Sequence, residues 1–129
     1  MVNDSISNLI NSLKVASIAK KDSITVPSSK KIVSILDTLK KFDFIESYEV
    51  SGDKKKTVKI ELKYIDGLPK INDAKRISKF SKRIYKKTKE FRPIKSGYGI
   101  SVVTTEKGVM SGVEAKKSKV GGEVLFEIW

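Results

Sequence analysis

In the stretch Thr57-Val58-Lys59-Ile60-Glu61-Leu62-Lys63-Tyr64, polar and apolar side chains alternate without interruption. A period of two is typical of a β-strand that buries one side and exposes the other. Residues 46–50 have the composition of a second strand, and the turn-forming Ser51-Gly52-Asp53 follows them. The pattern therefore predicts an antiparallel hairpin in this part of the chain.

On the N-terminal side of this hairpin, two amphipathic helices are expected around a short strand. Their apolar stripes recur with helical spacing and consist of Ile6, Leu9, Ile10 and Leu13, and of Ile32, Ile35, Leu36 and Leu39. Between them, Ile24-Thr25-Val26 is β-prone and ends at Pro27, after which Ser28 or Ser29 can cap the second helix. This order predicts an α+β domain over residues 1–66, with two helices on a three-stranded antiparallel sheet.

On the C-terminal side, Asp66-Gly67-Leu68-Pro69 is typical of a joint to a second domain, residues 67–129. Residues 100–105 are strongly β-prone, and Ser111 with Glu114 fits the capping box of a helix. Gly121-Gly122 should end that helix early, and Val124, Phe126 and Ile128 alternate as a final strand. The second domain is therefore expected to be mainly β with one short helix.

The composition of the 129 residues excludes several classes of chemistry. The chain has no cysteine and no histidine, which removes thiol nucleophiles, disulfides, Cys/His zinc sites and imidazole acid–base catalysis. It contains no Gly-Lys-Ser/Thr phosphate-binding loop and no identifiable pair of catalytic carboxylates. No apolar run approaches the roughly 18 residues of a membrane span. We expect a soluble intracellular protein that is not an enzyme, with no catalytic residue, metal, cofactor or small-molecule substrate.

The charge of the chain is concentrated in one stretch. Of the net +12, residues 70–95 contribute +9, from 11 basic side chains against Asp73 and Glu90, and all three arginines lie there. If the positive charge served only solubility, the basic residues would be spread more evenly along the chain. Their concentration in one stretch therefore favours a nucleic-acid partner. Tyr85 could add a ring contact, whereas Phe91 better fits a core position. A membrane surface is the alternative polyanion, but the stretch lacks a broad apolar helical face.

Three further segments carry possible RNA contacts. Hydroxyls in Thr104-Thr105-Glu106-Lys107-Gly108 could contact ribose across a shallow minor groove, although threonine is common at strand ends. Gly121-Gly122-Glu123 could allow close backbone approach to RNA, or could simply form a helix C-cap and turn. Lys30 and Lys31 in the first turn of a helix oppose its dipole, which is tolerable if they face phosphate; the alternative is that they simply lie on a solvated helix end.

Several of these segments together resemble one known family. The run from Gly97 to Met110, GYGISVVTTEKGVM, is similar to the signature of protein eight of the small ribosomal subunit, in its bacterial or organellar form. The match continues through Glu114–Lys117 and Val120–Leu125 and is preceded in order by Val26–Lys30 and Arg76–Lys79. The resemblance covers essentially the whole chain.

The resemblance implies two small α+β domains, with the basic stretch in strands and loops rather than in a helix. It implies a structural protein that binds the central domain of small-subunit ribosomal RNA directly and promotes assembly. Its partners would be that RNA, neighbouring small-subunit proteins and, as in bacterial members, its own messenger RNA. The protein would lie on the ribosome, in bacterial cytoplasm or in an organelle (mitochondrion or plastid). An extra-ribosomal translational repressor is the alternative with the same chemistry.

The family's Ser-Thr-Ser loop, which enters the minor groove, corresponds here to Thr104-Thr105-Glu106. Glu106 places an anion near RNA, so it should turn away, lower the affinity or accept bonds from 2′-hydroxyls. The predicted RNA-binding residues are Lys30 and Lys31; Lys75, Arg76, Lys79, Arg83, Lys86 and Lys87 for phosphate; Tyr85 for a ring contact; and Thr104, Thr105, Lys107, Gly108, Gly121, Gly122 and Glu123 for shape readout.

Overall fold

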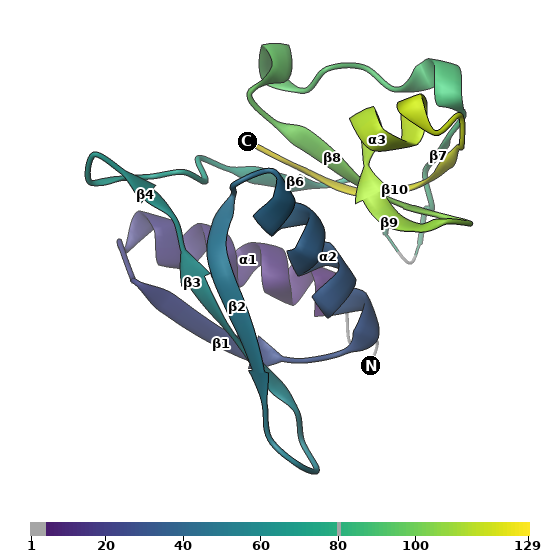
Figure 1. Ribbon diagram of the computed structural model, residues 1–129. Helices are drawn as coiled ribbons and strands as arrows, with labels where there is room; N and C mark the ends of the chain where they lie inside the picture. Colours follow the sequence, from purple (N-terminus) through teal and green to yellow (C-terminus); the bar gives the residue numbers. More distant parts are fainter. Residues whose placement is uncertain (1–4, 80) are drawn as a thin grey trace. The chain divides into compact units, whose positions relative to one another are not determined.

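The computed structural model describes residues 5–79 and 81–129, and the chain divides into two compact units, residues 1–72 and 73–129 (Figure 1). The Asp66-Gly67 turn, where the sequence suggested a joint, closes a small hairpin of β4 (Tyr64–Ile65) and β5 (Leu68–Pro69) inside the first unit. Both turn residues have positive φ, 53° and 79°, as a two-residue type I′ hairpin turn requires.

The first unit consists of two helices on a three-stranded antiparallel sheet, as expected (Figure 1). Its elements are α1 (Ser5–Ile18), β1 (Ser23–Pro27), α2 (Lys30–Lys41), β2 (Ile45–Ser51) and β3 (Thr57–Leu62). The strand order is β1-β3-β2. Both predicted apolar helix stripes are buried, together with Val58, Ile60 and Leu62 of the central strand. Ser29 caps α2, because its hydroxyl accepts a hydrogen bond from the Ile32 N–H at 3.2 Å.

Strand β3 is shorter than the alternating pattern predicts. It ends at Leu62, which pairs with the first residue of β2, Ile45. The next carbonyl, of Lys63, accepts a hydrogen bond from the Lys70 N–H at 2.9 Å instead. The strand therefore ends because its partner strand ends, although the side-chain alternation continues to Tyr64.

A side-chain hydrogen bond links the second helix to the sheet. The Tyr48 hydroxyl on β2 donates to a carboxylate oxygen of Asp37 on α2. This hydrogen bond raises the pKa of Tyr48, and burial and the Asp37 charge act in the same direction.

The second unit is mainly β with one short helix, as expected (Figure 1). Its elements are β6 (Ala74–Arg76), β7 (Tyr85–Lys86), the 3₁₀ turns η1 (Thr88–Glu90) and η2 (Lys95–Gly97), β8 (Ile100–Thr105), β9 (Gly108–Ser111), α3 (Gly112–Lys117) and β10 (Gly122–Ile128). The sheet order is β6-β10-β8-β9, and β7 also pairs with β10. A buried cluster beneath α3 consists of Phe91, Val103, Ala115, Val120 and Val124.

Three local predictions in this unit have clear outcomes. The capping box forms, since Ser111 and Glu114 exchange hydrogen bonds of 3.1 Å each. Residues 74–76 of the basic stretch form β6 rather than a helix, as the resemblance implies, because they pair with the end of β10. In β10, Leu125 is buried as well as its alternating neighbours, since the register with β8 shifts between Val124 and Phe126. The basic stretch therefore forms strands, turns and loops.

Candidate nucleic-acid interface

Three segments distant in the sequence meet at the beginning of β10. Gly122 pairs with Lys86 of β7 on one side and with Thr105 of β8 on the other. Thr105 in turn pairs with Gly108, the first residue of β9. The order across this end of the sheet is therefore Lys86, Gly122, Thr105, Gly108. Strand pairing thus brings together residues from the basic stretch, the threonine segment and the glycine pair. The sequence had indicated each of these three segments separately.

The adjacent row of the sheet consists of Tyr85, Glu123, Thr104 and Val109. Side chains paired directly across neighbouring strands lie on the same face. Tyr85 is 68% exposed, so its ring is available to a partner, whereas Thr104 is half-buried and Glu123 is buried. This row therefore presents one free aromatic ring and one accessible hydroxyl side chain.

The hydroxyl of Thr105 holds the β8–β9 turn in shape. It donates a hydrogen bond to the Gly108 carbonyl at 2.8 Å and accepts one from the Lys107 N–H at 3.0 Å. A hydroxyl has one proton and two acceptor positions, so one acceptor position remains. Glu106 and Lys107 are exposed at the tip of this turn. The loop is thus a rigid turn with a partly exposed hydroxyl and two exposed charges.

The two glycines before Glu123 are required by the packing of the protein itself. A Cβ on Gly122 would lie 2.3 Å from the Thr104 carbonyl oxygen, and one on Gly121 would lie 2.7 Å from that of Lys86. Real Cβ atoms essentially never approach so closely. The missing side chains therefore allow the start of β10 to lie against β7 and β8, which explains both glycines without an RNA contact.

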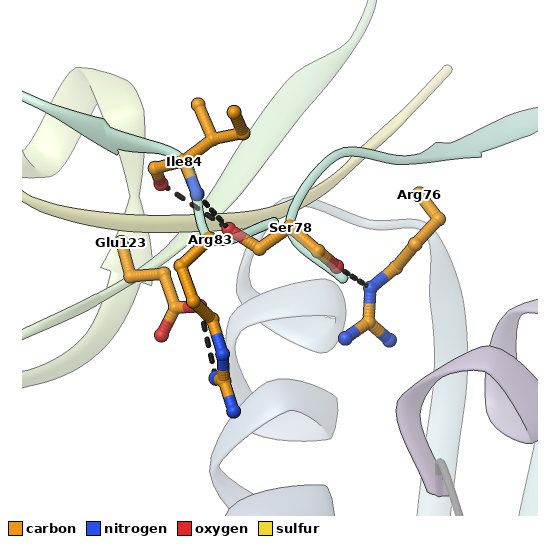
Figure 2. A network of polar contacts seen from close by, with 5 residues as sticks. All are labelled: Arg76, Ser78, Arg83, Ile84 and Glu123. Carbon is orange, nitrogen blue, oxygen red and sulfur yellow. Dashed lines mark hydrogen bonds and ion pairs between the residues drawn. The ribbon is translucent and has the colours of Figure 1, made fainter. Parts of the chain in front are cut away.

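Glu123 is engaged with Arg83 rather than exposed at the surface. Its carboxylate lies 3.1 Å from Nη1 of Arg83, and its side chain is only 8% exposed, whereas that of Arg83 is 44% exposed (Figure 2). A buried carboxylate needs such a partner. Glu123 therefore holds the Arg83 guanidinium in position at the surface, and part of the Arg83 charge is compensated within the protein.

Ser78 organises the basic loop, and sequence reasoning missed it. Its buried hydroxyl accepts a hydrogen bond from the Ile84 N–H at 2.8 Å and lies 3.2 Å from the Ile84 carbonyl, to which it donates (Figure 2). Nε of Arg76 donates to the carbonyl of Ser78. Lys79 and Lys82 pair across the intervening loop. The basic run holds two serines, Ser78 and Ser81, and nothing in the sequence indicates which of them makes these hydrogen bonds.

The predicted basic residues do not all lie at the same end of the sheet. Lys75 pairs with Glu127, five residues along β10 from Gly122 and so roughly 17 Å away at 3.3–3.4 Å per residue. Lys87 is exposed directly after β7, and Lys79 is exposed in the loop before it. Lys30 and Lys31 are exposed in the first turn of α2, in the other unit.

Clusters of carboxylates or long apolar helices would indicate other kinds of site. Among residues 5–79 and 81–129, no group of three Asp or Glu side chains could hold a metal ion. In that part of the chain, no helix is both long and apolar enough to cross a membrane. The cationic sheet end defined by β7, the β8–β9 turn and the start of β10 is therefore the candidate site that we consider further.

Comparison with known proteins gives a consistent result over the whole chain. The family model described as ribosomal protein S8 matches residues 4–129. Small ribosomal subunit protein uS8 of Helicobacter pylori (strain ATCC 700392 / 26695) is 41% identical over 131 residues, with full coverage of both chains. The protein of the same name from Helicobacter acinonychis (strain Sheeba) is 40% identical over 131 residues, also with full coverage. That of Mesomycoplasma hyopneumoniae (strain 7448) is 36% identical over 128 residues, covering 99% of this chain and 98% of the relative.

Proposed function

This chain belongs to the ribosomal protein S8 family, and from this membership we propose that it binds the ribosomal RNA of the small subunit directly, in the central domain, and promotes assembly of the subunit. Members of this family are structural proteins of the small ribosomal subunit rather than enzymes. The relatives with this name from Helicobacter and Mesomycoplasma are bacterial, which supports a bacterial ribosome as the location.

The observation that supports direct RNA binding best is the convergence of Lys86, Gly122 and Thr105 in one row of the sheet. Double-stranded RNA displays its 2′-hydroxyls and base edges in a wide, shallow minor groove, which a flat protein surface can contact. The free acceptor position of Thr105 is suited to a 2′-hydroxyl donor. Tyr85 lies in the adjacent row, whose side chains point to the opposite face of the sheet from that of Thr105. Its exposed ring would stack on a base or a ribose that reaches around this end of the sheet.

The lysines around this sheet end would supply the electrostatic part of the affinity. Lys79, Lys87 and Lys107 are exposed. Lys82, which pairs with Lys79 and is not among the predicted RNA-binding residues, is exposed as well. Contacts to phosphate fix register and orientation but carry no sequence information. Specificity would therefore depend on the threonine turn and on Tyr85. Any RNA with the same helical shape, including the chain's own messenger, would compete for the same surface.

The experiment is a comparison of Thr105→Ala and Thr105→Ser on two RNAs. One RNA is the central-domain helix of small-subunit ribosomal RNA, and the other is a random duplex of equal length. Thr105→Ala should cost about 1–2 kcal/mol of binding to the first RNA and less to the second, while Thr105→Ser should retain the affinity because it keeps the hydroxyl. Thr25→Ala, at an exposed threonine on β1, is the matched control.

If Thr105→Ala weakens binding to both RNAs equally, the readout role of the turn is wrong. Sedimentation with the small subunit at moderate salt tests the ribosomal assignment separately. A protein found only with messenger RNA would instead support the extra-ribosomal repressor.

A further inference from the structure

The second unit carries a small apolar hollow that takes no part in the proposed RNA interface. It lies between α3 and the segment that follows η1, and its volume is about 210 Å³. The residues that line it are Phe91, Arg92, Pro93, Gly112, Val113, Lys116 and Lys117. Phe91 belongs to the buried cluster beneath α3, whereas Val113 is 49% exposed in the first turn of that helix. The hollow thus exposes an apolar floor at the surface.

The rim of this hollow is cationic. Arg92 Nη1 donates hydrogen bonds to the carbonyl oxygens of Lys89 at 2.7 Å and Phe91 at 3.3 Å. Nζ of Lys116 lies 3.5 Å from the same Phe91 oxygen. Two cationic side chains therefore meet at one carbonyl, and Lys117 adds a third positive charge to the rim.

No carboxylate among the described lining residues balances this charge. The nearest acidic residue on α3, Glu114, is turned back to the Ser111 N–H at 3.1 Å as part of the capping box. Two lysines in the last turn of α3 complement its dipole, but the dipole does not account for Arg92 on a different segment. Three cationic side chains and no carboxylate therefore line the hollow around its apolar floor.

We propose that this hollow binds one large apolar side chain from an acidic segment of another protein. A cavity of about 150 Å³ can hold a benzene ring, whereas whole small-molecule ligands occupy about 300–1,000 Å³, so the hollow suits a single side chain such as Phe, Leu or Met. Asp and Glu on either side of that residue would face Arg92, Lys116 and Lys117. An apolar anchor within a charged rim is the usual arrangement of a protein-binding surface.

The chemistry of the floor favours a protein side chain over a nucleobase. A base presents donors and acceptors along its edges, and burying them without partners costs free energy. The floor, formed by Phe91, Pro93 and Val113, offers such an edge no polar side chain. An aliphatic or aromatic side chain has no polar edge to satisfy. This inference goes beyond the proposed RNA-binding function and does not depend on it.

The test uses the full chain and a panel of short peptides, each with one Phe, Leu or Met flanked on both sides by Asp and Glu. Binding is followed by NMR chemical shifts of the protein amides. Two control panels replace the apolar residue by Ser, or the acidic residues by Asn and Gln. The expected result is saturable binding of the first panel only, with Kd below about 1 mM, shifts centred on residues 91–93 and 112–117, and weakening with added salt.

Two substitutions test the location of the site. Val113→Asp places an anion in the hollow while retaining α3, because a carboxylate in the first turn complements the helix dipole. It should reduce peptide affinity at least tenfold and leave RNA affinity within twofold. Lys117→Glu should reduce peptide affinity at least threefold. The matched controls are Val15→Asp on α1 and Lys119→Glu just after α3. Both alter exposed residues outside the lining of the hollow, so both should leave the peptide affinity unchanged.

The absence of binding by every acidic peptide overturns the proposal, as does equal binding of the Ser controls. If Val113→Asp weakens RNA binding as strongly as peptide binding, the hollow is part of the RNA interface and the proposal is also wrong. Failure of the RNA proposal would appear instead in the Thr105 variants, with peptide binding intact. The two ideas are thereby separated.

Discussion

Replacing Gly122 by alanine distinguishes two reasons for a glycine at the start of β10. The new Cβ would lie 2.3 Å from the Thr104 carbonyl oxygen and 3.0 Å from Cγ2 of Thr105. Ordinary van der Waals contacts between a Cβ and a neighbouring heavy atom begin at 3.4 Å, so β10 and β8 must separate by about 1 Å to accept the new methyl group. If the glycine serves this packing, the substitution destabilises the protein without any RNA present. If it serves only close approach to RNA, stability should be unchanged.

The magnitude follows from the overlap. A ladder hydrogen bond of about 2.9 Å that is lengthened by about 1 Å is no longer a hydrogen bond. Losing it and straining the strands should cost about 1–3 kcal/mol, the usual range for an inserted methyl group in a packed site. For a chain of this length, such a cost lowers Tm by roughly 4–12 °C. Gly121→Ala, with its less severe 2.7 Å approach to the Lys86 carbonyl oxygen, should have a smaller effect of the same kind.

The assay is urea and thermal unfolding of the full chain, followed by circular dichroism in the absence of RNA. Amide chemical shifts of Thr104 and Thr105 report the displacement of β8 directly. RNA affinity should also fall, because the threonine turn moves with its strand. If Gly122→Ala unfolds within about 0.5 kcal/mol of the wild type and loses only RNA affinity, the packing argument is refuted and direct approach of RNA explains the glycine.

Four other changes have separate expected outcomes. Lys86→Ala should reduce the slope of log affinity against log salt concentration by about one, and an unaltered slope would place this lysine away from phosphate. Glu106→Ser should raise RNA affinity about fivefold, since a like-charge contact at ~4 Å costs about 1 kcal/mol in water; weaker binding would show that the carboxylate accepts bonds from RNA hydroxyls. Arg83→Ala removes the ion-pair partner of the buried Glu123 and should lower the free energy of unfolding by about 1–3 kcal/mol, a loss that a second substitution, Glu123→Gln, should partly relieve. Tyr48→Phe removes a phenol whose pKa is raised by its hydrogen bond to a carboxylate on α2. The wild type should therefore be more stable than this variant below about pH 10, and the difference should disappear as the pH rises through the raised pKa of Tyr48. A difference in stability that does not change with pH would contradict this.

Features that depend on neighbours in the sequence could be predicted from it. The alternation around Ile60 identified a strand, the stripe around Leu36 identified a helix, and the Ser111 capping box marked a helix start. Each of these signals acts over one or two turns of a helix or a few residues of a strand. The concentration of positive charge between residues 70 and 95 likewise indicates a polyanionic partner.

Features that depend on strand pairing could not be predicted in this way. The end of β3 at Leu62 is determined by where β2 begins. The register shift between Val124 and Phe126 in β10 allows Leu125 to be buried although it interrupts the alternation of buried residues. The segment from Ala74 to Arg76 forms a strand because β10 supplies its partner. In each case, a backbone segment distant in the sequence provides the hydrogen bonds. The pattern of a short segment therefore does not specify the structure that forms.

The fold class, the family and the residue types available for RNA recognition follow from the order of the amino acids. Which of those residues meet depends on the tertiary structure: Lys86 and Thr105 lie on either side of Gly122, Lys75 on β6 pairs with the other end of β10, and Glu123 is paired with Arg83. The physical reason is that composition and periodicity are properties of a short segment. Proximity, by contrast, is created by the register of strands joined from distant parts of the chain.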